Sequence, residues 1–272
     1  MVLEGGLLMN IFTRELKANR KSLIIWCACM AVGVLSGMAK YTAYSGSGAS
    51  PQVFDKLPQS MRALLGMGSL DVSTMPGFFG FLFFYIAVAV AFHAALLGSG
   101  ILAKEERDKT TEFLYVKPVP RAAVISAKFL AALMNILILN LVTLVCSIGM
   151  VNVYNKGKDI TGEIVLFFVS LLIIQLIFLS LGAMVSAVLK NPKSAGSISS
   201  GIVLMAFLID EITNINSHLN ALNLLSPFKY FSSSRIIAGN GFDAVIVLLS
   251  VLLAAVFTVL TYFFYRKRDL NV

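Results

Sequence analysis

The sequence predicts an all-α integral membrane protein with six transmembrane helices. Of its 272 residues, 58% are hydrophobic and only 13% are charged, whereas a soluble domain carries roughly a quarter charged residues. Apolar stretches long enough for a helix to cross a bilayer core of about 30 Å follow one another along the chain, separated by short polar segments. We therefore expect one transmembrane domain over residues 1–272, without a separate soluble domain or a catalytic centre.

The first 21 residues predict an N-terminal extension followed by an amphipathic helix at the membrane surface. Ile11, Phe12 and Leu16 alternate with basic residues at helical spacing, a pattern typical of a helix in the headgroup layer. A solvated start to the first span is the alternative. No basic segment or cleavage site precedes Met9, so we expect no signal peptide.

Six apolar stretches mark the expected spans. They cover approximately residues 22–39, 78–102, 122–151, 164–189, 197–209 with a few residues beyond, and 244–265. The fifth is the shortest, because Asp210 and Glu211 follow it directly. It reaches the length of a full crossing only with the small residues from Ser194 onward.

The distribution of lysine and arginine predicts a multi-pass protein of the plasma membrane with both termini in the cytoplasm. Fifteen of the 22 basic residues lie before the first span, around the second-to-third connection, after the fourth span or after the sixth. Basic residues concentrate on the cytoplasmic side of short loops. The net charge of +8 therefore reflects membrane topology and contact with anionic lipids, and it does not indicate a nucleic-acid partner.

The first external loop, residues 40–77, is long enough to carry structure of its own. Pro58 suits the first turn of a helix that Gly66 could end, with Met61, Leu64 and Leu65 on one face. Such a helix would rest on the outer membrane surface or cover the external mouth. A simple packing role is equally open.

The second-to-third connection, residues 104–121, is densely charged, then apolar, then interrupted by two prolines. A helix leaving the second span should end by Lys117, because a residue before proline avoids the α region. Phe113, Leu114 and Tyr115 would then lie on the cytoplasmic side, bordered by charges. Such aromatic residues usually mark a partner site, although an interfacial turn with its aromatics in the headgroups is the alternative.

This connection resembles the signature of the ABC type 2 exporter permeases. Its core is Lys109-Thr110-Thr111-Glu112-Phe113-Leu114, and its ending is Pro118-Val119-Pro120-Arg121. Further agreement comes from Leu57-Pro58 with Leu64-Leu65-Gly66, and from Leu225-Ser226-Pro227-Phe228-Lys229-Tyr230. Lys109 and Pro120 replace the glycine and serine of many members. The resemblance covers the chain from Met9 onward.

The resemblance implies the membrane subunit of an ABC exporter, a homodimer that couples to two copies of a separate ATPase. ATP and Mg²⁺ would bind to that ATPase, since this chain holds no G-x-x-x-x-G-K-[ST] loop, and no cofactor is expected here. The family's cytoplasmic coupling helix lies between spans two and three. Carried over, it places Glu105, Glu106, Arg107, Glu112, Phe113 and Tyr115 at the ATPase contact.

Small residues within the spans predict close helix contacts. They form two groups, the first of Gly33 with Gly37, and the second of Gly196 with Ser200 and Ser197 with Gly201. A spacing of four residues lets helix backbones approach. The resemblance favours a contact with the second copy, while packing within the chain remains open.

Polar residues within the spans are candidates for a cargo path. Asn135, Asn140 and Gln175 lie deep in apolar stretches, where hydrogen bonds between helices are the more common explanation. Asp210 and Glu211 could attract cationic cargo, or could form an ordinary helix end at the water interface.

A metal site and an intramembrane hydrolase are the rejected alternatives. Cys27 and Cys29 have no matching second pair. Ser99 and His93 are six residues apart, which on a helix separates them by about 120° and roughly 9 Å.

No motif in the spans identifies the cargo. We expect an amphipathic peptide or a hydrophobic drug-like compound, because the aromatic-rich second span could offer an apolar wall; aromatics that face lipid are the alternative. An ATPase-coupled immunity protein that senses peptides without moving them is the second functional hypothesis.

Overall fold

The computed structural model describes residues 2–45, 58, 61–62, 65–68, 70–108, 120–155, 157, 159–215 and 217–268. Every regular element within these ranges is helical. The longer helices are α1 (Val2–Ala39), α5 (Met75–Arg107), α7 (Arg121–Tyr154), α8 (Thr161–Val188), α9 (Ala195–Ile215) and α11 (Ala244–Lys267). The shorter ones are α2 (Tyr41–Ser45), η1 (Pro192–Ser194), η2 (Ser217–Leu225), η3 (Pro227–Tyr230) and α10 (Ser233–Ile237). The six longer helices are apolar enough to cross a membrane, which confirms the predicted fold class.

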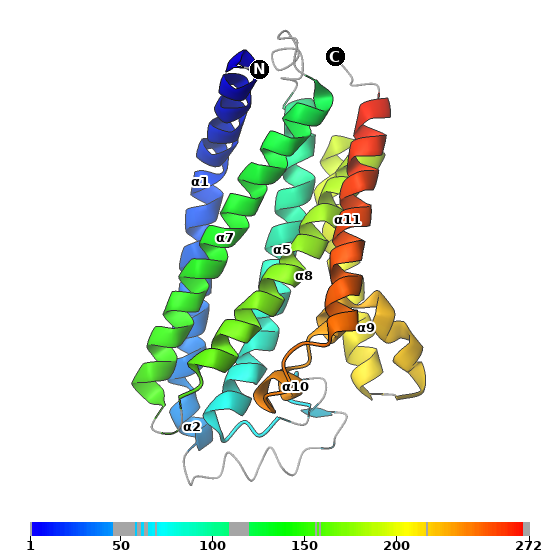
Figure 1. Cartoon of the computed structure of the whole chain (residues 1–272). Coiled ribbons are helices and arrows are strands. Elements are labelled where there is room, and N and C mark those ends of the chain that lie inside the picture. The colour runs from blue at the N-terminus through cyan, green and yellow to red at the C-terminus, as the bar shows by residue number, and fades with distance from the viewer. Residues whose placement is uncertain are drawn as a thin grey trace.

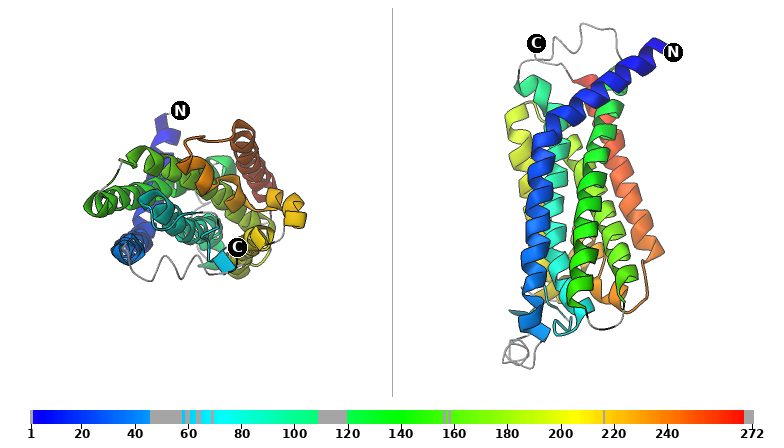
Figure 2. Two further views of the ribbon diagram at one scale, coloured as in Figure 1. Left: turned by 90° about the horizontal axis from the view of Figure 1, so that it is seen from below. Right: turned by 90° about the vertical axis from the view of Figure 1, so that its left-hand side faces the viewer.

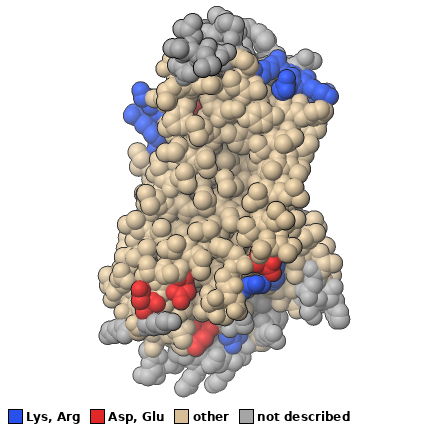
Figure 3. All heavy atoms as spheres, viewed as in Figure 1, with Lys and Arg blue, Asp and Glu red and all other residues tan. Residues whose placement is uncertain are grey.

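The long helices form one bundle around the pair α5 and α8. α1 packs mainly on α7, α9 on α5, and α11 on α8. Both chain termini lie at the same end, here called the terminal end, while α2 and α10 lie at the opposite, distal end (Figure 1). Charged side chains gather at these two ends on the face shown, and the belt between them is uncharged (Figure 3).

The central pair is held at close range by two glycines. A Cβ on Gly98 of α5 would lie 2.1 Å from the Leu179 carbonyl oxygen, and a Cβ on Gly182 of α8 would lie 2.3 Å from that of Ala95. The absence of these side chains lets the two backbones touch. Ser99, beside Gly98, donates its hydroxyl to the Leu96 carbonyl at 3.2 Å. Packing therefore explains Gly98, the glycine that precedes Ser99.

The first helix joins two predicted elements. α1 runs without interruption from Val2 to Ala39, so the predicted interfacial segment is helical and continuous with the first span. Figure 2 shows its N-terminal part leaning away from the rest of the helix. Its position at a membrane surface remains a prediction.

The fifth helix includes the residues expected beyond the apolar stretch 197–209. α9 runs from Ala195 through Asp210 and Glu211 to Ile215. Their side chains are buried, only 4% and 5% exposed. Interpreting this pair as a helix end at the water interface is therefore wrong; tertiary packing shields the carboxylates, which local sequence cannot reveal.

The turn expected at Pro58 is present in the residues described there. The amides of Met61 and Arg62 donate to the Pro58 carbonyl at 2.9 and 3.1 Å. Gly66 ends the turn with φ of 73°, a conformation that glycine adopts without strain. Pro58 and Gly66 thus lie where the ends of the turn were expected, while Leu64 and residues 59, 60 and 63 lie outside the described residues.

Candidate functional site

A group of buried charges lies at the terminal end of the bundle. Lys128 of α7 has no exposed surface. Its Nζ donates to the Ile101 carbonyl at 2.6 Å, to both Glu105 oxygens at 2.6 and 2.7 Å, and to Glu15 Oε1 at 3.4 Å. An ammonium group has three protons. All three are thus used, by partners on α1 and α5.

Arg14, whose side chain is 54% exposed, lies at the rim of this group, and we call Arg14, Glu15, Glu105 and Lys128 together the buried ion cluster. Arg14 Nη2 lies 3.0 Å from Glu105 Oε1 and 3.4 Å from Glu15 Oε1. Two cations therefore face two carboxylates, which offsets the cost of removing Lys128 and the carboxylates from water. The cluster joins α1, α5 and α7 at the level where the second-to-third connection begins.

A second set of contacts fixes the end of the chain to the same region. Arg268 donates to Glu106 Oε2 of α5 at 2.5 Å and to the Ser186 carbonyl of α8 at 2.6 Å. Arg121, the first residue of α7, donates to three carbonyls at the end of α11, the nearest being that of Arg268 at 2.6 Å. Such bonds satisfy carbonyls that a helix end leaves free. We call Glu106, Arg121 and Arg268 the C-terminal clasp.

Both ends of the second-to-third connection are therefore anchored inside the chain. Residues 109–119 lie outside the described residues, and so do the predicted contact residues Glu112, Phe113 and Tyr115. The side chains of Glu105 and Glu106 are 5% and 4% exposed, so they serve the cluster and the clasp. Arg107 is half exposed and pairs with Asp108 at 3.1 Å.

Sequence reasoning missed the internal partners of these carboxylates. Lys128 and Arg268 entered it only as basic charges of the cytoplasmic side, and Glu15 only as an acidic one. A lysine seven residues after Arg121, within an apolar stretch, was the available signal, since ionisable residues inside spans usually have a specific partner.

The small-residue faces divide between the surface and the interior. A Cβ on Gly33 or Gly201 would meet nothing within 4 Å, and Ser197 is exposed. In contrast, a Cβ on Gly37 would lie 2.5 Å from Leu82, and one on Gly196 would lie 3.5 Å from Leu96. Packing within the chain thus explains Gly37, while Gly33, Ser197 and Gly201 remain open to a second copy.

The predicted cargo-path residues lie inside the bundle. Asn140 of α7 donates to Gln175 Oε1 of α8 at 3.1 Å, and Asn135 donates to the Ala131 carbonyl at 2.7 Å. All three side chains are buried. The bond between Asn140 and Gln175 is a contact between helices of the kind that the sequence suggested. A role of these residues along a cargo path remains a prediction.

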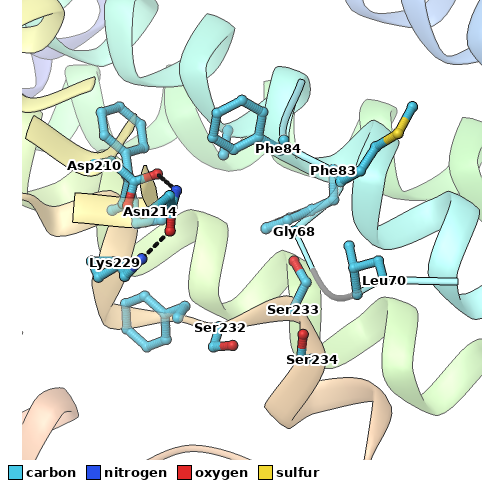
Figure 4. A pocket seen from close by; sticks show the side chains of 16 residues that line it. Gly68, Leu70, Phe83, Phe84, Asp210, Asn214, Lys229, Ser232, Ser233 and Ser234 are labelled. Carbon is cyan, nitrogen blue, oxygen red and sulfur yellow. Dashed lines mark hydrogen bonds between the residues drawn. The ribbon is translucent and has the colours of Figure 1, made fainter. Parts of the chain in front are cut away.

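A cavity of about 310 Å³ lies at the distal end. It is lined by residues of α5, α8 and α9, by the segment from Phe228 to Ser234, and by Gly66, Met67, Gly68 and Leu70 (Figure 4). Asp210 accepts a hydrogen bond from Asn214 Nδ2 at 3.2 Å, and Asn214 in turn accepts from the Lys229 ammonium. An amide thus stands between the carboxylate and the cation.

Two neighbours of this cavity have unusual environments. Glu211 is 5% exposed, and neither of its carboxylate oxygens accepts a hydrogen bond within the described part of the chain. Tyr230 donates its hydroxyl to the Leu224 carbonyl at 2.5 Å, and burial raises the pKa of this phenol. The distal end thus retains polar groups that the fold only partly satisfies.

Six apolar helices with charged clusters at their ends define a multi-pass helical membrane protein. Comparison with protein families narrows this class. The model described as "ABC-2 family transporter protein" matches residues 9–270, and the chain belongs to this family of ABC-2 type transporter permeases. A search of curated proteins finds no match. The resemblance inferred from the second-to-third connection is thereby confirmed, and membership implies, in general, an ABC ATPase partner.

Proposed function

We propose that this chain is the membrane-spanning half of an ATP-driven exporter, working as a homodimer with two copies of a separate ATPase. Family membership supports the transport role. The anchoring of the second-to-third connection supports the coupling role. Both termini and this connection would then lie in the cytoplasm of a cell whose plasma membrane holds the bundle, as the basic residues favour.

The observation that carries the coupling proposal is the position of the buried ion cluster and the C-terminal clasp. Glu105 and Glu106 lie just before residues 109–119, and Arg121 lies just after them. A partner that pushes on this connection would therefore act on α1, α5, α7, α8 and α11 through short, charge-assisted bonds, which resist displacement more than neutral ones. Glu112, Phe113 and Tyr115 are the residues that we assign to the ATPase surface itself.

The homodimer would form along the open small residues of α1 and α9. Gly33, Ser197 and Gly201 leave surface that nothing in the described chain covers. Gly37 and Gly196 would support this surface from within. Crosslinking of single cysteines at positions 33 and 201 between two copies would test this arrangement, and a monomeric permease that retains coupled activity would contradict it.

The cargo is proposed to be an amphipathic peptide or a hydrophobic drug-like compound. Translocation is favoured over sensing alone because the family is one of transporters. Uptake of a labelled peptide into inverted vesicles, driven by ATP, would separate the two. ATP hydrolysis without uptake would favour the immunity function.

The coupling proposal is tested by replacing the two aromatic residues together, Phe113→Ala with Tyr115→Ala. Truncating a buried aromatic anchor commonly costs about 2 kcal/mol or more in binding, so the ATPase should no longer co-purify while the permease stays folded. Phe263→Ala is the matched control, since Phe263 is an exposed aromatic on α11. Full ATPase binding by the double variant would place the contact elsewhere.

A further inference from the structure

We propose that the distal cavity binds an alkylammonium group carried on an apolar or aromatic body, and that cargo enters the transporter through this contact. The cavity assignment stands on geometry and charge alone. Calling the ligand cargo rests on the proposed export function.

The cavity combines one carboxylate with aromatic walls. Asp210 lies at its edge on α9, and the walls include Phe83, Phe84, Phe228 and Phe231. Figure 4 shows Phe83 and Phe84 on one side and Asp210 with Asn214 and Lys229 on another. A cation close to an aromatic face is attracted by the ring, and the rings also bury apolar surface. This combination suits an organic ammonium ion better than a hydrated inorganic one.

The Asp210 carboxylate is the group at this cavity that could bind a cation. Asp210 and Glu211 are both acted on by Lys229, but Lys229 spends its hydrogen bond on the Asn214 amide. Among the described residues, the Asp210 carboxylate accepts only from that neutral amide. Arg62, in the neighbouring turn, donates to the Leu70 carbonyl at 3.4 Å. Asp210 is thus separated from the Lys229 ammonium by a neutral amide.

Glu211 follows Asp210 on α9 and is not itself among the residues that line the cavity. Its carboxylate is buried and accepts no hydrogen bond in the part of the chain that the structure describes. A buried carboxylate without partners is costly, and the negative potential that it adds next to Asp210 would favour an arriving cation. No group of three metal-ligating side chains is present among the described residues, so an ammonium ion is the better match.

The size of the cavity limits the ligand. Pockets for drug-sized molecules span roughly 300–1,000 Å³, and this one, at about 310 Å³, is at the small end. It holds one amphipathic group, such as a lysine side chain or an amine joined to an aromatic ring. A larger peptide would present one such group and remain mostly outside.

The test measures binding to the purified full-length chain in phosphatidylcholine nanodiscs, without the ATPase. The probe is dansylcadaverine, a primary alkylammonium joined to a naphthalene ring, whose fluorescence rises in an apolar site. Its analogue with a hydroxyl in place of the ammonium is the ligand control. Saturable binding of the amine and at least tenfold weaker binding of the hydroxyl analogue are expected, as for hydrogen bonds to a charged group.

Two variants of the site should change the affinity for the amine in opposite directions. Asp210→Asn keeps the shape and should weaken amine binding about tenfold or more, whereas Lys229→Met removes a competing cation and should strengthen it. Asp243→Asn is the matched control, because Asp243 is partly buried, pairs with Arg235 at 3.2 Å, caps α11 and does not line the cavity, and binding should not change. Unchanged binding in Asp210→Asn, or loss of binding in Lys229→Met, would overturn the site.

Competition decides whether the ligand is cargo. A short amphipathic peptide of lysine and leucine should displace the probe, while adding phosphatidylethanolamine to the nanodisc should not. Displacement by the lipid alone would overturn the cargo assignment. Since no ATPase is present, a failure of ATPase coupling would leave these results unchanged, and the two proposals can fail separately.

Discussion

The two ends of the bundle bury carboxylates in different ways. At the terminal end, Lys128 uses all its protons on a backbone carbonyl and the carboxylates of Glu15 and Glu105. At the distal end, Asp210 accepts from a neutral amide, and Glu211 accepts from no described group. Compensated charges can hold helices in place, whereas uncompensated ones cost stability and are kept where a ligand can use them. The comparison distinguishes an anchor at the terminal end from the proposed binding site at the distal end.

The first prediction is that breaking the buried ion cluster has the largest effect. Lys128→Met preserves side-chain length but leaves two buried carboxylates without their main cation. Removing one partner from a buried ion pair commonly costs about 3–5 kcal/mol. We expect a loss of this order in the free energy of unfolding, measured by denaturation in mixed micelles.

Two further variants show whether stranded charge is the cause. Lys193→Met, at an exposed lysine, should change little, as is usual for surface positions. Adding Glu15→Gln and Glu105→Gln to Lys128→Met should recover much of the loss. A Lys128→Met variant as stable as the Lys193→Met control would mean that the cluster is not an anchor.

The second prediction concerns the C-terminal clasp, where we expect a smaller loss of stability than in the buried ion cluster. Arg268→Met removes bonds to Glu106 and to the Ser186 carbonyl. Hydrogen bonds to charged groups contribute about 1.5–3 kcal/mol, so hydrogen exchange at the end of α11 should accelerate correspondingly. Arg266→Met, which alters an exposed arginine two residues earlier, is the control. Equal exchange in both variants would show that the clasp does not hold this helix end.

The third prediction is a gain in stability, opposite to the losses expected in the first two. Glu211→Met replaces a buried carboxylate that accepts no hydrogen bond within the described residues, and we expect the free energy of unfolding to rise by about 1–2 kcal/mol. Glu163→Met is the control, because Glu163 lies in the first turn of α8, where a negative charge is mildly stabilising. A Glu211→Met variant that loses stability would indicate a structural partner for this carboxylate and remove the contrast between the two ends.

Sequence reasoning succeeded where local pattern decides structure. The six spans, the turn between Pro58 and Gly66, and the bond between Asn140 and Gln175 follow from hydropathy, proline and glycine positions, and the need to pair polar groups in a membrane. The motif of the second-to-third connection identified the family. Each of these signals lies within a short segment or depends only on depth in the bilayer.

The features that the sequence did not predict depend on which helices pack against each other. Glu15 and Lys128 are 113 positions apart in the chain, and nothing local to either residue specifies the other. The contact of Gly98 with Gly182's helix likewise requires the rotation of α5 and α8 about their axes. Burial of Asp210 depends on segments both before and after it in the chain, among them Phe83, Ile174 and Phe228. These features arise from tertiary packing, which periodicity alone does not determine.

The smallest predicted effect uses a carboxylate that is neither buried nor ionically paired within the described residues. Asp159 is fully exposed, and its Oδ1 accepts hydrogen bonds from the Thr161 amide at 2.9 Å and the Thr161 hydroxyl at 2.6 Å. These bonds hold the pKa of Asp159 below its ordinary value of 3.8. Asp159 therefore isolates the effect of hydrogen bonding from that of burial, which the two ends of the bundle combine.

The sign of the pH effect follows from this lowered pKa. A group with a depressed pKa in the folded state stabilises at pH above its unfolded pKa, and the stabilisation is lost as pH falls through the folded pKa. Acidification from pH 5 to below the folded pKa should thus loosen the start of α8, seen as a changing Thr161 amide chemical shift and faster exchange relative to the intrinsic rate. Asp159→Asn keeps an acceptor oxygen without this titration, so its Thr161 amide should respond little to pH. An equal response in both proteins would mean that another group titrates there and that Asp159 does not fix the start of this helix.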